Sequence, residues 1–319
     1  MQNQQPTILT RNFRHGLLEE EHFGFITRVS RSGKLLETFG ESFDEPFYLR
    51  SCEKPLQASL AIDYGLDLTD KELALASGSN AGEKCHYETA LGFAEKFNIR
   101  AENLKCGVHK PLSKTRQAEM LLTGEKENVF HNNCVGKHLT MLALCKKLDL
   151  PCENYDELEH PLQQLVIKKV SELCALQKTY PITKDGCGVP VMSMPLKNMV
   201  LGFINLFCDP KYEKMTAAIR NNPYIYGGED RTDTKIVERS GLIAKVGAGG
   251  LCIVVNTEIE EGFVVKVSDC DMKARELIVI DYINRLGWGN FTAEKSIKTL
   301  HGEIAGEIST LFAFSPTLS

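Results

Sequence analysis

The chain has 319 residues, 43% of them hydrophobic, and a net charge of -5. It is long enough for a large core, and its dispersed lysines and arginines argue against a nucleic-acid partner. No apolar run reaches the roughly 18 residues of a membrane span, and the polar start shows no secretion signal. Eleven cysteines without a tight framework favour a reducing compartment, so we expect a cytoplasmic protein and no membrane partner.

Strand character comes first along the chain. Residues 22–37 predict a hairpin, because 23–29 alternate and 31–33 (RSG) can form its turn. From 54 to about 147 the apolar residues recur at helical spacing, which predicts that most of this stretch is helix. Further helices are predicted at 161–174, 196–207 and 211–220, the first of them opening on a proline.

Strands are predicted again at 243–246, 251–256 and 262–267, before a helix at 271–285 and a last strand. This order favours an α+β fold in which an antiparallel sheet, built from both chain ends, packs against a helical region inserted between them.

We expect one compact catalytic domain over 1–319. Its helical subdomain would span roughly 54–220, inserted in a sheet part at roughly 8–50 and 240–319.

The segment 50–57 (RSCEKPLQ) places Ser51 three residues before Lys54 at the start of an apolar, helix-like run. On a first helical turn the two side chains share one face. A partly desolvated lysine can take the proton of a serine hydroxyl, so the two residues are a candidate Ser-Lys hydrolase pair. Alone, the spacing is better explained by an N-cap serine followed by a solvated lysine.

Four further motifs join reactive side chains to glycines, which let a backbone approach a ligand closely. They are 78–86 (GSNAGEKCH), 131–138 (HNNCVGKH), 185–190 (DGCGVP) and 245–250 (KVGAGG).

With these motifs the chain resembles the bacterial L-asparaginases of the type found in Rhizobium. The most specific matches are the Asn-Asn-Cys-x-Gly-Lys-His run at 132–138 and the Asp-Gly-Cys-Gly-x-Pro run at 185–190. Weaker likeness extends to the following positions: Arg14, Gly16, His22, Arg50, Ser51, Lys54, Cys106, His109, Pro111, His160, Gly227 and Arg231.

The resemblance implies a fold of the serine β-lactamase and glutaminase kind, with a Ser-x-x-Lys helix start and a Lys-x-Gly strand facing one cleft. Ser51 and Lys54 match the first motif, and Lys245 with Gly247 looks like the second. Ser79 and Lys245 would then form a second Ser-Lys tandem beside the first.

The resemblance also implies zinc, with ligands that map onto Cys134, Lys137 and Cys187. Both cysteines lie in glycine-flanked polar loops where a thiolate can be stabilised, and Lys137 could bind a metal only as the neutral amine. The alternative is that the two thiols are buried or only orient the substrate.

Four residues are expected to contact the substrate: Asp185, Asn80, Arg50 and His138. Asp185 is placed to receive a substrate ammonium or to orient a ligand. His138 could equally be a structural histidine.

Three positions depart from the family pattern: Asn80 replaces a usual histidine, Gly249 a usual glutamate and Lys273 a usual arginine. An arginine fork is not reproduced by lysine, which puts substrate anchoring in question. The three departures also fit an alternative, a degenerate family member that binds an amino acid without hydrolysing it.

We therefore predict an L-asparaginase that hydrolyses the side-chain amide of L-asparagine, acting as a homodimer. A glutaminase or another amidohydrolase remains the alternative, since one methylene in a shaped pocket is worth only about 1–3 kcal/mol.

Overall fold

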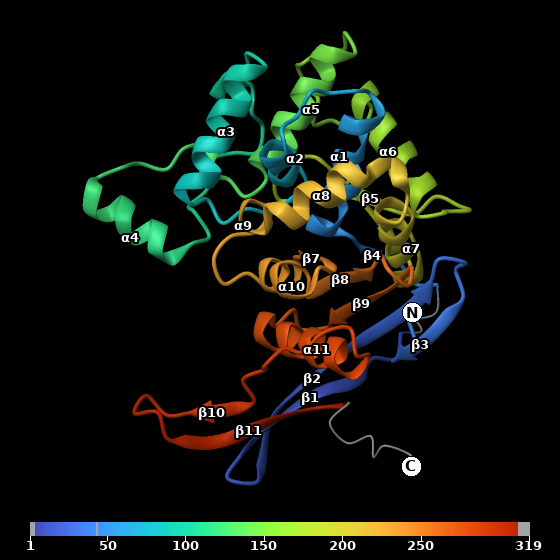
Figure 1. The fold of residues 1–319 in the computed structure, drawn as a ribbon, viewed down its shortest axis with the longest axis vertical. Helices are drawn as coiled ribbons and strands as arrows, with labels where there is room; N and C mark the ends of the chain where they lie inside the picture. Colours follow the sequence, from blue (N-terminus) through green and yellow to red (C-terminus); the bar gives the residue numbers. More distant parts are fainter. Residues whose placement is uncertain (1–3, 43, 312–319) are drawn as a thin grey trace.

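The computed structural model describes residues 4–42 and 44–311. Its main sheet is antiparallel and runs in the order β10-β11-β1-β2-β9-β8-β7, with β3 paired to β2 (Figure 1). The bounds of its strands are as follows: β1 Thr7–Arg14, β2 Leu17–Ser30, β3 Leu35–Phe39, β7 Ile243–Gly247, β8 Leu251–Asn256, β9 Glu261–Val267, β10 Ser296–Lys298 and β11 Ile304–Thr310.

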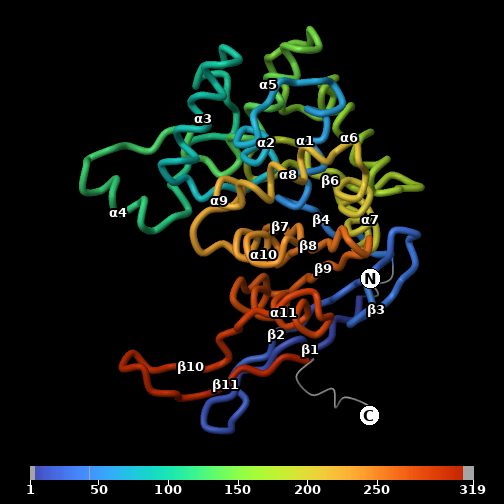
Figure 2. Tube along the Cα trace, viewed as in Figure 1, coloured from blue at the N-terminus to red at the C-terminus, as the bar shows by residue number. Residues whose placement is uncertain are grey.

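The sheet joins the two ends of the chain, as the sequence predicts. β1 pairs with β11 and β2 pairs with β9, so that strands from the first and last parts of the chain lie side by side (Figure 2). The α+β prediction is thereby confirmed. The predicted hairpin forms between β2 and β3, but β2 begins at Leu17 rather than His22 and also pairs with β1. The ends of the predicted domain, 1–3 and 312–319, lie outside the described residues.

The central strands are buried on both faces. Along β8, Cys252 and Val254 pack on one face with α10 and α11, while Ile253 and Val255 pack on the other with the core of the helical region. Side chains alternate between the faces of a strand, so a continuous apolar run such as 251–255 implies cover on both sides.

The region between the two sets of main-sheet strands is mostly helical, and Figure 1 shows most of these helices stacked on one side of the sheet, while α10 packs with α11 on the other face. The predicted helical stretch from 54 to 147 is divided into five α-helices, and the segments between them include two 3-10 helices, Ala101–Asn103 and Val129–His131. The bounds are α1 Lys54–Asp63, α2 Asp70–Ser77, α3 Lys84–Lys96, α4 Lys114–Thr123, α5 Val135–Lys147, α6 Pro161–Leu173, α7 Leu196–Phe207, α8 Glu213–Asn221, α9 Pro223–Tyr226, α10 Thr232–Ser240 and α11 Met272–Arg285.

A second, small sheet was missed by the sequence analysis. It is antiparallel in the order β4-β6-β5, from Phe47–Tyr48, Pro190–Met194 and Ile182–Lys184. Strands of two to five residues carry too little alternation to be separated from loop or buried helix. The sheet matters because β4 leads directly into the serine motif, and the turn between β5 and β6 carries Cys187.

Among residues 4–42 and 44–311 the longest helix is α11, with 14 residues, and no helix is both long and apolar enough to cross a bilayer. All eleven cysteines are free thiols, most of them buried.

Candidate active site

Ser51 lies in a short 3-10 helix, Arg50–Glu53, that follows β4 and leads directly into α1. The preceding residue, Arg50, has a left-handed φ of 50°, a conformation that costs free energy for a residue with a side chain and is often found at functional sites. The Ser51 side chain is half-buried, and its hydroxyl makes no hydrogen bond within the described part of the chain. Ser51 is therefore accessible and not committed to a partner.

Lys54 is the first residue of α1 and is 1% exposed. Its Nζ donates to Ser79 Oγ at 2.9 Å and to the carbonyl of Asn133 at 2.8 Å. Burial lowers the pKa of Lys54, and the nearby Lys137 and Lys245 cations act in the same direction against the attraction of the cysteine sulfurs. The structure thus brings Lys54 to a serine, but that serine is Ser79.

Ser79 follows α2 and is 2% exposed. Its backbone N–H donates to the carbonyl of Tyr226 at 3.1 Å, which fixes the loop after α2 against α9. The start of α5 also comes close to α2, because a Cβ on Gly136 would lie 2.3 Å from the Leu75 carbonyl oxygen. Only glycine permits that approach, and it places the motif at 132–138 near Ser79.

The three predicted metal ligands come together beside Lys54. Cys134 is the N-cap of α5 and Lys137 lies in its first turn, whereas Cys187 comes from the β5–β6 turn. Lys137 Nζ lies 3.0 Å from Cys187 Sγ, and the two thiols share a hydrogen bond. All three side chains are about 5% exposed. We call Lys54, Cys134, Lys137 and Cys187 the thiol–lysine cluster.

Charge in this cluster is concentrated on one sulfur. The hydrogen bond from Cys187 holds the pKa of Cys134 well below its usual value, against the effect of burial and with help from Lys54 and Lys137. The same hydrogen bond and burial raise the pKa of Cys187. Although burial opposes it, the two sulfurs raise the pKa of Lys137. Without a metal, the cluster therefore pairs a Cys134 thiolate with a Lys137 ammonium.

Cys187 lies within hydrogen-bond reach of both Cys134 and Lys137. Two soft thiols and one amine form a donor set that suits zinc, provided that Lys137 loses its proton on binding. Another grouping of possible ligands, Glu83, Cys85 and His86, lies at the start of α3. There His86 Nδ1 accepts from the N–H of Glu83, and Nε2 lies 2.8 Å from the Tyr224 carbonyl. Because both ring nitrogens have partners, this second grouping is better explained as helix capping.

Two contacts tie the Cys187 turn to the serine motif. Arg50 Nε donates to Asp185 Oδ1 at 2.7 Å, and Glu53 Oε2 accepts from the N–H of Met192 at 3.0 Å. Although burial opposes it, Lys137 and then Arg50 lower the pKa of Asp185, so that it is a carboxylate. Burial raises the pKa of Glu53 to about 7. The predicted substrate contacts Arg50 and Asp185 thus pair with each other at this site.

The other two predicted substrate contacts are completely buried. Asn80 Oδ1 accepts from the N–H of Gly82, and its Nδ2 has no partner among the described residues. His138 Nδ1 lies 2.6 Å from the Tyr155 hydroxyl. Burial holds the pKa of His138 well below its usual value, so the ring is neutral.

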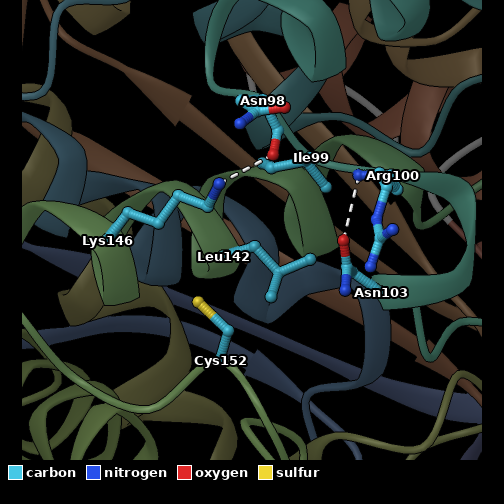
Figure 3. Close-up of a pocket in the computed structure, with 7 residues that line it drawn as sticks. All are labelled: Asn98, Ile99, Arg100, Asn103, Leu142, Lys146 and Cys152. Atoms are coloured by element: carbon cyan, nitrogen blue, oxygen red, sulfur yellow. Dashed lines mark hydrogen bonds between the residues drawn. The ribbon is translucent and has the colours of Figure 1, made fainter.

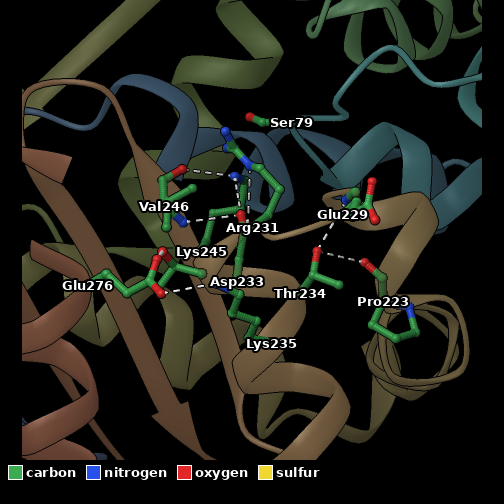
Figure 4. Close-up of polar contacts among 12 residues, drawn as sticks. Ser79, Pro223, Glu229, Arg231, Asp233, Thr234, Lys235, Lys245, Val246 and Glu276 are labelled. Atoms are coloured by element: carbon green, nitrogen blue, oxygen red, sulfur yellow. Dashed lines mark hydrogen bonds and ion pairs between the residues drawn. The ribbon is translucent and has the colours of Figure 1, made fainter. Parts of the chain in front are cut away.

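Lys245, on β7, is paired with a carboxylate that the sequence analysis did not identify. Its Nζ lies 3.2 Å from Asp233 Oδ2 and 2.8 Å from the Val246 carbonyl, and both Lys245 and Asp233 are fully buried (Figure 4). Arg231 lies next to this pair, with Nε 3.8 Å from Asp233 Oδ1. We call Arg231, Asp233 and Lys245 the carboxylate cluster. Lys245 and Ser79 share no hydrogen bond in the described part of the chain.

The two clusters lie close enough to interact electrostatically, since Lys245 is among the charges that affect Lys54. A buried amine with a lowered pKa, two serines and a set of fixed cations can activate an alcohol and stabilise negative charge. The arrangement suits acyl transfer.

Comparison with known proteins supports the same chemistry. The profile of the L-asparaginase II family matches residues 10–309. The chain belongs to this family. Its members are amidohydrolases, so the predicted enzyme class is confirmed, as is the resemblance found in the sequence. No curated protein sequence matches the chain.

Solved structures give looser similarities. A β-lactamase from Mycobacterium bovis is 11% identical, with a TM-score of 0.43 over 84% of this chain and 95% of its own. An octameric penicillin-binding protein homologue from Pyrococcus abyssi is 14% identical, with a TM-score of 0.32 over 83% and 73%. With TM-scores below 0.5, these similarities do not inform the site.

Besides Asn80, two positions depart from the family pattern, Gly249 and Lys273, and they lie in different parts of the structure. Gly249 has a φ of 77° in the turn between β7 and β8, which favours glycine over the usual glutamate. Lys273 is exposed at the start of α11. Two residues later, however, Arg275 is buried and its Nη1 lies 3.3 Å from the Gly247 carbonyl, so an arginine does reach the end of β7.

Sequence reasoning missed Asp233, and it noted Arg231 only as a match to the family. Aspartate is common in the first turn of a helix, where it offsets the helix dipole, and so Asp233 gave no distinctive signal.

A pocket of about 400 Å³ lies elsewhere, between the segment 98–103 that follows α3 and helix α5 (Figure 3). Its lining contains none of the predicted site residues: Asn98, Ile99, Arg100, Asn103, Leu142, Lys146 and Cys152. Lys146 Nζ donates there to the carbonyls of Phe97 and Asn98, so its charge is already solvated by the backbone.

Proposed function

We propose that this amidohydrolase is an L-asparaginase, converting L-asparagine to L-aspartate and ammonia. The observation that carries the proposal is the buried Lys54 amine, held 2.9 Å from Ser79 Oγ one helical turn from the accessible Ser51. An amine with a lowered pKa can accept the proton of a serine that attacks an amide.

In the proposed reaction, Ser51 Oγ attacks the carboxamide carbon while its proton passes to Lys54, directly or through the Ser79 hydroxyl. The N–H of Ser51 would stabilise the oxyanion. The C–N bond then breaks, and the departing nitrogen takes the proton that Lys54 accepted from Ser51, relayed through the Ser79 hydroxyl, and leaves as ammonia. The fixed charge of Lys245 would assist this relay. A water molecule then attacks the ester carbonyl and gives a proton to Lys54, which returns it to Ser51 Oγ as the ester bond breaks and aspartate is released.

We further propose that zinc is held by Cys134, Lys137 and Cys187. When bound there, it would supply positive charge that orients substrate and shapes the pocket. The protein supplies its own nucleophile, and so the zinc is not required to generate one. Arg50 and Asp185 tie the Cys187 turn to the serine motif and would position both for the same substrate.

The test is release of ammonia from L-asparagine and, in parallel, from L-glutamine, each with and without a chelator. Turnover of asparagine at a kcat/KM at least tenfold above that of glutamine supports the proposal. A preference for glutamine identifies a glutaminase. Binding of asparagine without ammonia release identifies a member that binds an amino acid only.

A homodimer and a cytoplasmic location also belong to this proposal. The scattered free cysteines support the second. Light scattering of the purified protein would give the mass of the assembly, with twice 35.6 kDa expected.

A further inference from the structure

The carboxylate cluster contains more positive than negative charge. Arg231 and Lys245 are two cations, and Asp233 is the only acidic side chain in the described residues that forms an ion pair with either of them. Asp233 Oδ2 already accepts from Lys245 Nζ at 3.2 Å. Its other oxygen, Oδ1, remains 3.8 Å from Arg231 Nε, outside hydrogen-bond range, and neither atom has a hydrogen-bond partner among the described residues.

Arg231 is held close to Ser79 by the backbone. The segment 226–229 lies against the segment 79–83, because the N–H of Ser79 donates to the Tyr226 carbonyl and the N–H of Glu229 donates to Glu83 Oε1 at 3.0 Å. Arg231 follows two residues later as the N-cap of α10, and in Figure 4 its side chain extends toward Ser79.

A ligand can reach the guanidinium of Arg231 from solvent. The side chain is 25% exposed, so its terminal nitrogens are reached from solvent although Nε is buried. A partly desolvated guanidinium with an unfilled donor favours a planar anion that can accept two parallel hydrogen bonds.

We infer that Arg231 binds the α-carboxylate of the amino-acid substrate. This inference rests on the proposed function, since asparagine carries a free carboxylate beside the amide that is cleaved. A carboxylate bound there would supply the missing negative charge and would direct the side-chain amide toward the serines. Arg231 is then the substrate anchor that Lys273, which is exposed, cannot provide.

The test compares L-asparagine with its α-methyl ester, in which the carboxylate is blocked. In the wild-type enzyme, we expect kcat/KM to favour asparagine by about 100-fold, the range of a charged, bidentate contact. Arg231→Gln should raise KM for asparagine about 100-fold and leave kcat/KM for the ester within about threefold. Arg231→Lys should recover only part of the loss, because it lacks the fork. Arg239→Gln, an exposed change on the same helix, is the control.

Activity on the ester shows that Arg231→Gln is folded, and an equal loss with both substrates would overturn the inference. If the wild-type protein does not hydrolyse asparagine, the proposed function fails and calorimetry with L-aspartate decides the inference separately. Weaker aspartate binding by Arg231→Gln supports the anchor. Unchanged binding, or no binding by either protein, overturns it.

Discussion

Lys54 and Lys245 are both buried in the active-site region, but their partners differ. Lys54 donates to a hydroxyl and a carbonyl beside two thiols, whereas Lys245 donates to the fully buried carboxylate of Asp233. A thiol changes charge with its proton or with a bound metal, whereas Asp233, whose pKa is lowered mainly by Lys245 against the effect of burial, stays ionised.

Because of this difference, we expect Lys54 and Lys245 to have different roles in catalysis. Burial lowers the pKa of Lys54, against the attraction of the Cys134 and Cys187 sulfurs, and this lowering favours a role as proton acceptor. Lys245 has a permanent counter-ion and is suited to fixed positive charge and to relay.

The largest effect is expected at the serine that Lys54 activates. Ser51→Ala should lower turnover of asparagine by at least about a thousandfold, because removal of a covalent nucleophile abolishes the acyl-enzyme route. Steady-state ammonia release measures it, and Ser79→Ala is measured in parallel. If turnover falls further in Ser79→Ala than in Ser51→Ala, Ser79 is the nucleophile and Ser51 is not. The hydrogen bond from Lys54 to Ser79 is compatible with that outcome.

Replacement by arginine distinguishes the two lysines. Lys54→Arg should lower kcat by about 100-fold to 10,000-fold, because a guanidinium cannot accept a proton. In the wild-type enzyme, the rate should rise with pH as Lys54 loses its proton, and this limb should disappear in the variant. Lys245→Arg should lower kcat by less than Lys54→Arg does. If kcat falls equally in both variants, Lys54 and Lys245 do not have the separate roles of general base and fixed positive charge.

Zinc should be confined to the thiol–lysine cluster. Elemental analysis should find about one zinc per chain, and Cys187→Ser should abolish its retention, because an alcohol is a weak ligand for zinc. Metal affinity should fall with decreasing pH, as protons compete for the sulfur and amine ligands. Cys208→Ser, at a half-buried thiol outside the cluster, should keep the metal. Fully active, metal-free protein would contradict a functional zinc.

The smallest effect on catalysis, but a clear one on stability, is expected at Asp233. Asp233→Asn leaves Lys245 without its buried counter-ion, and the free energy of unfolding should fall by about 3–5 kcal/mol. Denaturant unfolding measures it. Asp230→Asn, at an 88% exposed side chain in the preceding loop, should change it by no more than about 0.5 kcal/mol. If the two variants are equally stable, Asp233 does not balance the cations.

Much of the architecture could be predicted because it follows from local periodicity. The alternation in 23–29 and the apolar runs at 251–256 and 262–267 appear in the structure as β2, β8 and β9. The small sheet could not be predicted, since β4 has two residues and gains its stability from Leu49 and Glu53 bonding to Met192. Such pairing depends on residues about 140 positions apart, and no local pattern records it.

By itself, the sequence determined the order of the main helices and strands, the family, and the set of reactive side chains at the four glycine-flanked motifs. Residue type and short-range spacing are enough for those conclusions. Only the tertiary structure decided which partners meet: Lys54 with Ser79 rather than Ser51, Arg50 with Asp185, and Lys245 with Asp233. A hydrogen bond or an ion pair depends on distances of about 3 Å between segments that are remote in the chain, and the packing of α2, α5 and the sheet sets those distances.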